Sequence, residues 1–117
     1  MMRLTGTMAA MAACAALAAA AQAPQGDAAR GQALFMKDMC YTCHGTAGQG
    51  GDRGSGPRLT PGLFPWEGFQ QQVRHPRAVM PRYATQFVSD QDLADIYAYL
   101  ASIKSGPSAK DIPLLRE

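Results

Sequence analysis

Residues 40–44 read Cys40-Tyr41-Thr42-Cys43-His44. This stretch is the most informative part of the sequence, because it holds two of the three cysteines and one of the two histidines. A redox-active C-x-x-C motif accompanies a βαβ pattern, and no strand pattern is found in this sequence. A zinc site needs four ligands, and only the distant His75 is left to complete one. Cys43 and His44 are also adjacent, which makes it hard to direct both at one tetrahedral ion.

The same spacing is the recognised signal for covalent attachment of haem. Cys40 and Cys43 are predicted to form thioethers with the edge of one porphyrin. The histidine that follows the second cysteine is then placed under the ring, so His44 is the expected proximal ligand of the iron. The stretch therefore predicts one covalently bound haem c.

The sixth iron position is predicted to be closed by Met80, since a haem that only transfers electrons usually carries Met or His there. Met80 follows the proximal histidine by 36 residues and lies in a proline-stiffened loop. Met36 and Met39 lie on the predicted helix just before the attachment stretch and are expected to pack as apolar side chains. His75 is the alternative ligand, and its simpler interpretation is a surface histidine that ends a helix.

Residues 1–23 are predicted to be a secretory signal peptide, which places the protein in the periplasm. They combine Arg3, an uncharged stretch of fourteen residues over 8–21, and an A-x-A cleavage pattern at 21–23. A transmembrane anchor needs about 20 strongly apolar residues, and this shorter stretch is mostly alanine. Lipidation at Cys14 is a further alternative, but the residues before it fit a lipoprotein site poorly.

The rest of the chain is predicted to form one domain over 24–105, followed by a tail over 106–117. These 94 residues hold 37 apolar residues, 11 Gly and all 8 Pro. So few apolar residues are marginal for an independent hydrophobic core. We therefore expect the protein without haem to be largely unfolded. The net charge without residues 1–23 is +1, which argues against a nucleic-acid binder.

Helices are predicted over 28–40, 65–74 and 89–104, so the fold class is all-α. Asp27 is the expected N-cap of the first helix, and Ser89 with Asp92 forms a capping box for the last. The last helix places Leu93, Ile96, Tyr97, Leu100 and Ile103 on one face. The glycine-rich stretch 45–62 is predicted to be a loop that wraps the edge of the haem.

The order of these motifs resembles class I c-type cytochromes, the small single-haem electron carriers. The resemblance covers residues 26–104 and rests on five features: a helix with Gly31 and Phe35, the attachment stretch, Gly56-Pro57-Arg58-Leu59, Met80-Pro81, and a final helix with Tyr97 and Leu100. It implies a small fold of three or more helices wrapped around the haem.

The resemblance also implies particular contacts. The first and last helices are expected to cross with Gly31 and Phe35 against Tyr97 and Leu100. The carbonyl group of Pro57 is expected to accept a hydrogen bond from the free N–H of the proximal histidine, which orients the ligand and increases its basicity.

The implied function is electron transfer without bond chemistry, so we do not expect an enzyme. The protein is expected to be a free carrier or the cytochrome subunit or partner of a periplasmic dehydrogenase, exchanging electrons with redox proteins such as a terminal oxidase. Two other classes stay as alternatives: a haem sensor or enzyme with an open sixth iron position, and a thiol redox or metal-binding protein without haem.

The charge pattern allows two interpretations. Five arginines fall between residues 53 and 82, where Glu67 is the only acidic residue. They are Arg53, Arg58, Arg74, Arg77 and Arg82. They are either ordinary solvated side chains or a positive rim around the haem that steers an acidic redox partner. Unlike the better-known mitochondrial members, the chain lacks a lysine-rich face.

Overall fold

The computed structural model describes residues 23–52 and 55–115, and within these ranges it is helical with no strand. Its helices are α1 (Ala28–Lys37), α2 (Tyr41–His44), α3 (Trp66–Arg74) and α4 (Asp90–Ser102), followed by the 3₁₀ turns η2 (Ala109–Asp111) and η3 (Pro113–Leu115). The all-α prediction is confirmed. The predicted signal peptide lies outside the described residues, except for its last residue.

α1 begins where the sequence predicts but ends three residues earlier. The Asp27 side chain accepts hydrogen bonds from the N–H groups of Ala29 and Arg30, at 2.8 and 3.0 Å. The helix stops at Lys37 because the backbone turns at Met39, whose φ of 63° lies in the left-handed region. The predicted end at residue 40 was therefore wrong, and the attachment stretch begins a separate helical turn, α2.

α4 carries the predicted capping box. The Asp92 N–H donates to Ser89 Oγ and the Ser89 N–H donates to the Asp92 carboxylate, both at 3.1 Å. The helix ends at Ser102 rather than at residue 104. Of the predicted apolar face, three residues are buried: Leu93, Ile96 and Leu100.

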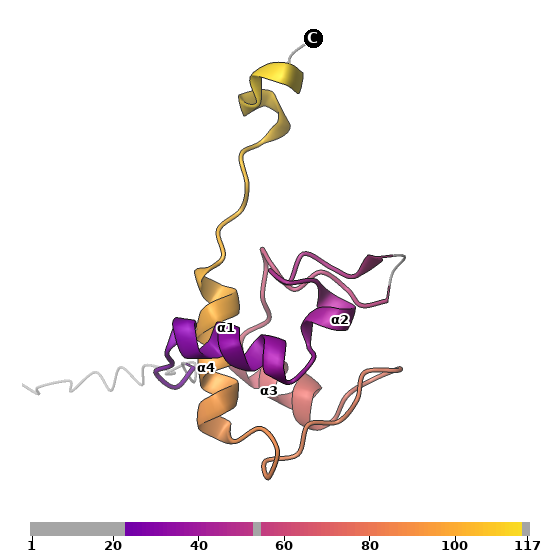
Figure 1. Cartoon of the computed structure of the whole chain (residues 1–117), viewed down its shortest axis with the longest axis vertical. Coiled ribbons are helices and arrows are strands. Elements are labelled where there is room, and N and C mark those ends of the chain that lie inside the picture. Colours follow the sequence, from indigo (N-terminus) through magenta and orange to yellow (C-terminus); the bar gives the residue numbers. More distant parts are fainter. Residues whose placement is uncertain (1–22, 53–54, 116–117) are drawn as a thin grey trace, which may run out of the picture.

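α1 and α4 cross, as Figure 1 shows, and the crossing depends on a glycine. A Cβ atom on Gly31 would lie 1.9 Å from the Asp95 carbonyl oxygen, so only glycine permits this approach. Phe35 packs on Tyr99 with ring centroids 5.8 Å apart. The resemblance implied Tyr97 as the aromatic partner of Phe35, and this was wrong by two residues. Tyr97 instead packs against the buried aromatic side chains of α3.

A buried carboxylate lies at the same crossing. Asp95 is 2% exposed and accepts hydrogen bonds from the Asp27 N–H at 2.8 Å and from Gln91 at 3.0 Å. Arg30 forms ion pairs with both Asp95 and Asp92. Burial raises the pKa of Asp95, but these hydrogen bonds and the Arg30 charge outweigh it and hold that pKa below its ordinary value. The acidic residues of α4 thus tie it to the start of α1.

α3 lies across the core, and its predicted apolar face is confirmed, since Trp66, Phe69 and Val73 are all buried. After α4 the chain leaves the helices and runs outward through η2 and η3 (Figure 1). No helix among the described residues is long and apolar enough to cross a membrane.

Candidate haem site

An apolar cavity of about 550 Å³ opens between the helices and the loops that join them. This volume falls in the range of about 300–1,000 Å³ that is usual for ligand sites. The apolar lining comes from every α-helix except α2 and from the connecting loops, and it includes Phe35, Leu59, Phe69, Val88, Ile96 and Leu100. The same wall contains all five residues singled out from the sequence: Cys40, Cys43, His44, Pro57 and Met80.

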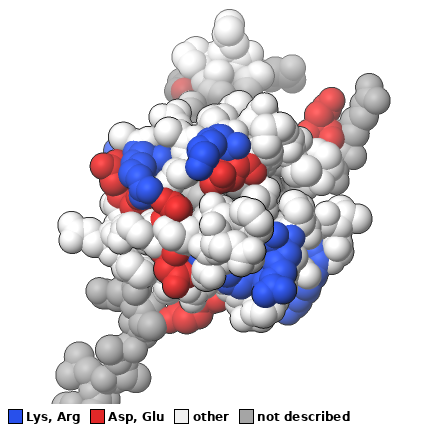
Figure 2. Space-filling view, turned by 60° about the horizontal axis from the view of Figure 1, so that its bottom comes forward, with Lys and Arg blue, Asp and Glu red and all other residues white. Residues whose placement is uncertain are grey.

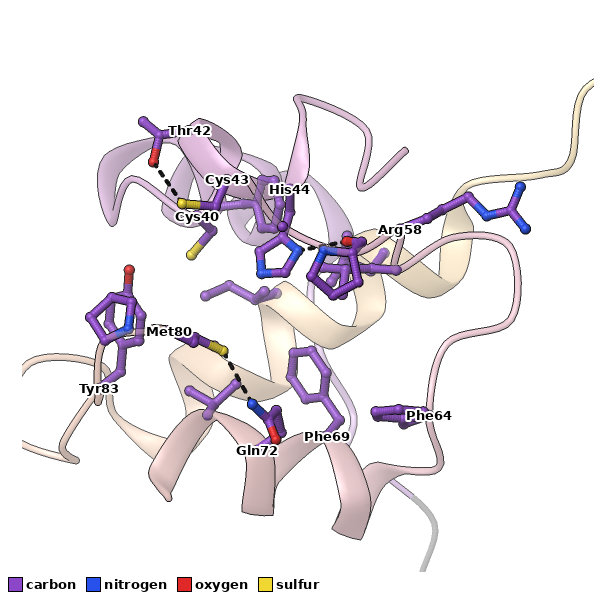
Figure 3. A pocket seen from close by; sticks show the side chains of 18 of the residues that line it. Cys40, Thr42, Cys43, His44, Arg58, Phe64, Phe69, Gln72, Met80 and Tyr83 are labelled. Atoms are coloured by element: carbon purple, nitrogen blue, oxygen red, sulfur yellow. Dashed lines mark hydrogen bonds between the residues drawn. The ribbon is translucent and has the colours of Figure 1, made fainter. Parts of the chain in front are cut away.

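His44 is held in one orientation by a backbone carbonyl. The side chain ends α2 and is 9% exposed. Its Nδ1–H donates to the Pro57 carbonyl oxygen at 2.8 Å, which is the contact that the resemblance implies. This bond directs the other ring nitrogen, Nε2, into the cavity (Figure 3). A neutral imidazole nitrogen in this position has its lone pair free for a metal ion.

Glycine brings the Pro57 carbonyl within reach of His44. A Cβ atom on Gly56 would lie 2.4 Å from the Cys43 carbonyl oxygen, closer than any side chain permits. The loop that follows α2 therefore folds back directly against the backbone of α2. This explains in physical terms why a Gly-Pro pair stands at this point of the chain.

Cys40 is half-buried on the cavity wall. Burial, with a smaller contribution from the neighbouring Asp38 carboxylate, raises its pKa to about 11. Reactive redox cysteines have the opposite property, a lowered pKa that yields thiolate at neutral pH. Cys40 therefore lacks the lowered pKa that is typical of a reactive redox cysteine.

Met80 reaches the cavity from the loop that follows α3. The backbone turns at Ala78, whose φ of 56° is left-handed, and Met80 then packs half-buried against the core. Figure 3 shows its thioether below the imidazole of His44. Its sulfur accepts a hydrogen bond from Gln72 Nε2 of α3 at 3.7 Å. Gln72 was not identified from the sequence, although its place between Phe69 and Val73 puts it at the edge of the apolar face.

Arg74 anchors the same loop from α3. Its guanidinium donates to the carbonyl oxygens of Tyr83 and Val88 at 2.9 and 2.8 Å, and it pairs with Asp90 at 2.7 Å. The Tyr83 hydroxyl donates to the Asp38 carbonyl oxygen at 2.9 Å. The segment that carries Met80 is therefore fixed to α3, to the start of α4 and to the end of α1.

The other candidate ligands lie in less suitable positions. Met36 is partly buried and packs against the core, as predicted. Met39 lies on the cavity wall but is 55% exposed, and it belongs to the turn that leads into the attachment stretch. His75 is exposed and caps the C-terminus of α3, which matches its simpler interpretation.

The arginines between residues 53 and 82 lie in different environments. Arg53 lies outside the described residues, and the Arg74 side chain is directed inward to backbone carbonyls. Arg58 and Arg77 are exposed and line the mouth of the cavity. Figure 2 shows some basic side chains directly against acidic ones and others gathered apart from them.

Comparison with known proteins identifies the class. The family model described as cytochrome C oxidase, cbb3-type, subunit III matches residues 26–100. The cytochrome bc1 complex cytochrome c subunit of Corynebacterium diphtheriae is 36% identical over 85 residues, which is 70% of this chain and 29% of that protein. The chain thus spans less than a third of this relative. No solved structure gives a significant match. This chain belongs to the c-type cytochromes, a family of haem-binding electron-transfer proteins.

Proposed function

We propose that this chain is an exported electron carrier that holds one haem c. Cys40 and Cys43 would form the thioethers, and His44 and Met80 would be the axial ligands. The observation that carries the proposal is the apolar cavity with both cysteines and His44 on one side and the Met80 thioether on the other.

The donor set fits a haem. An imidazole whose Nδ1–H is already bonded to Pro57 and a half-buried thioether match the His/Met pair of electron-transfer haems. A largely apolar wall suits the flat face of a porphyrin. Cys40, the N-cap of α2, and Cys43 within the helix lie at the same end of the cavity as His44, where a tether would hold the ring against the imidazole.

A bound haem supplies an iron that accepts and releases one electron. The chain's own residues keep that centre in a constant environment. Pro57 holds the His44 ring, and Arg74 and Tyr83 hold the loop of Met80. Such fixed ligands keep structural change on electron transfer small, and no residue is required to move a proton.

The partners are proposed to be redox proteins on either side of this carrier, such as a periplasmic dehydrogenase or a terminal oxidase. The relative named above is a subunit of a bc1 complex, and the matching family description names an oxidase subunit. Both support electron exchange with a protein partner, as a free carrier or as a subunit. Arg58 and Arg77 at the cavity mouth would favour an acidic surface on that partner.

Intact mass tests covalent attachment. The protein is expressed in a periplasm that contains the haem-attachment machinery, and its mass should exceed that of the chain without the signal peptide by one haem. Cys43→Ser should reduce the yield of loaded protein sharply, since one thioether is lost. An unmodified mass for the parent protein would overturn the proposal, and full loading of the variant would refute the role of Cys43.

Met80→Ala tests the distal ligand. We expect it to abolish the sulfur-to-iron absorption band of the oxidised protein, lower the reduction potential, and allow carbon monoxide to bind the reduced form rapidly. Rapid carbon monoxide binding by the parent protein at neutral pH would instead support the alternative of a sensor or enzyme with an open iron position. An unchanged band in Met80→Ala would assign the ligand to another residue.

A further inference from the structure

We propose that Gln72 tunes the iron through Met80, as a positioning residue whose amide withdraws electron density from the thioether sulfur. The inference rests on the proposed function, because it takes Met80 as the distal ligand. Gln72 is the residue whose side chain contacts the Met80 sulfur through a hydrogen bond, with Nε2 and Sδ 3.7 Å apart. This distance is normal for a donor to sulfur, a weak acceptor.

The contact between Gln72 and Met80 follows from the position of Gln72 on α3. The side chain is half-buried at the cavity wall, and its helix is held in the core by buried Phe69 and Val73. Figure 3 shows its amide nitrogen pointing at the Met80 sulfur. A donor on a rigid helix therefore faces a sulfur on an irregular loop.

The loop that carries the acceptor, Met80, is held in place by contacts that do not involve the donor, Gln72. Arg74 binds the Tyr83 carbonyl oxygen at 2.9 Å, and the Tyr83 N–H donates to the Val73 carbonyl oxygen at 3.2 Å. The loop after Met80 is thus attached to α3 through its backbone. Loss of the Gln72 amide would leave these anchors in place, so the loop does not depend on Gln72 for its path.

The sign of the effect follows from the chemistry of the thioether. Its sulfur has two lone pairs, so one can bind iron while the other accepts the Gln72 N–H. The hydrogen bond reduces donation by the sulfur, and the oxidised iron, being poorer in electrons, loses more from this than the reduced iron. Gln72 should therefore raise the reduction potential and weaken the bond between sulfur and oxidised iron.

The test uses two variants of the haem-loaded protein. Gln72→Leu removes the donor at similar volume, and Gln72→Asn keeps an amide one methylene shorter, which draws the donor away from the sulfur. Two quantities are measured: the reduction potential, and the imidazole concentration that displaces the sulfur ligand in the oxidised protein. Both variants should lower the potential and require several-fold more imidazole.

A purely structural role predicts the opposite ligand behaviour. If Gln72 only supported the loop, its loss would loosen Met80, and less imidazole would displace the sulfur. That result, or unchanged values in both variants, would overturn the inference. Gln71→Leu is the matched control, since Gln71 is the exposed neighbour on the same helix and should leave both quantities unchanged. Absence of the sulfur-to-iron band in the parent protein would instead refute Met80 as the ligand. This measurement therefore distinguishes a failure of the proposed ligation from a failure of the inference about Gln72.

Discussion

The Nδ1 atom of His44 and the carbonyl oxygen of Pro57 are joined by a 2.8 Å hydrogen bond between α2 and the glycine-rich loop. The two residues are thirteen positions apart, and the bond closes the loop over the attachment stretch. It fixes the tautomer of His44, because a carbonyl oxygen only accepts, so the proton must lie on Nδ1. In the neutral imidazole, Nε2 is then the nitrogen whose lone pair can bind iron.

Gly56→Ala should break this arrangement without changing either partner. A Cβ atom would lie 2.4 Å from the Cys43 carbonyl oxygen, so the loop must move away from α2 and take the Pro57 carbonyl with it. We expect the holoprotein to lose about 1–3 kcal/mol of stability, as for other overpacked sites. The reduction potential should rise, since His44 becomes a weaker donor to iron. Denaturant unfolding and a potentiometric titration measure the two effects.

Gly106→Ala is the control for this substitution. A Cβ atom on Gly106 would meet nothing within 4 Å, so stability and potential should both stay unchanged. If Gly56→Ala behaved like Gly106→Ala, the close approach of the loop to α2 would be unimportant for the iron ligand.

Arg74→Met should loosen the loop of Met80. The guanidinium satisfies the carbonyl oxygens of Tyr83 and Val88 from a side chain that is only 11% exposed. Leaving these acceptors without a donor should cost about 2–4 kcal/mol of unfolding free energy. We also expect the sulfur ligand of the oxidised protein to be lost at a lower pH than in the parent. A pH titration of the sulfur-to-iron band measures this.

Asp90→Asn separates the carbonyl contacts from the ion pair. The Asp90 side chain is 65% exposed, and such surface pairs are worth about 0–1 kcal/mol. The variant should therefore keep nearly full stability and an unchanged pH titration. An effect as large as that of Arg74→Met would mean that charge, rather than the two carbonyl contacts, anchors the loop.

Removal of haem should unfold the protein. The cavity of about 550 Å³ lies between the helices, and its wall includes core side chains such as Phe35, Ile96 and Leu100. Other apolar side chains of the same wall face water when no ligand is bound, since Phe64 and Val79 are 63% and 92% exposed, and a core of this size cannot close such an opening. The variant with both cysteines changed to alanine, expressed without haem, should show weak helical circular dichroism and no cooperative melting. A compact, cooperatively melting form would show that the helices suffice without haem.

The features predicted well from the sequence depend on residues close together in the chain. The capping box joins Ser89 to Asp92, three positions further on. The N-cap at Asp27 is equally local. Spacing alone defines such features, so they could be predicted before any tertiary contact was known.

The features that were missed are contacts between distant segments. Asp95 and Asp27 are 68 positions apart, and Arg74 and Val88 are 14 apart, so no local pattern indicates either pair. The early end of α1 has another cause. Met39 adopts a left-handed conformation that its residue type does not favour, and tertiary structure therefore sets that turn. In the sequence Gln72 is an ordinary polar residue of a helix. Its contact with Met80, eight positions away, exists only because the tertiary structure places the loop of Met80 beside α3.

The buried carboxylate of Asp95 should make stability depend on pH. Its pKa in the folded protein lies below the ordinary value, which is about 3.9 in the unfolded chain. The ionised form is therefore favoured by folding, and this contribution is fully present above about pH 4 and is lost as the pH falls through the native pKa. Asp95→Asn imitates the protonated form and should lose about 1–3 kcal/mol at neutral pH, as expected for hydrogen bonds to a charged group.

The difference between Asp95→Asn and the parent holoprotein should shrink as the pH falls below about 4, because both then carry a neutral side chain. Urea unfolding at a series of pH values measures it. Asp111→Asn is the matched control, since Asp111 is exposed in η2, and its stability should follow that of the parent throughout. A constant difference between Asp95→Asn and the parent across the pH range would mean that shape or packing, rather than the charge held by Arg30 and the Asp27 N–H, makes Asp95 important at the crossing of α1 and α4.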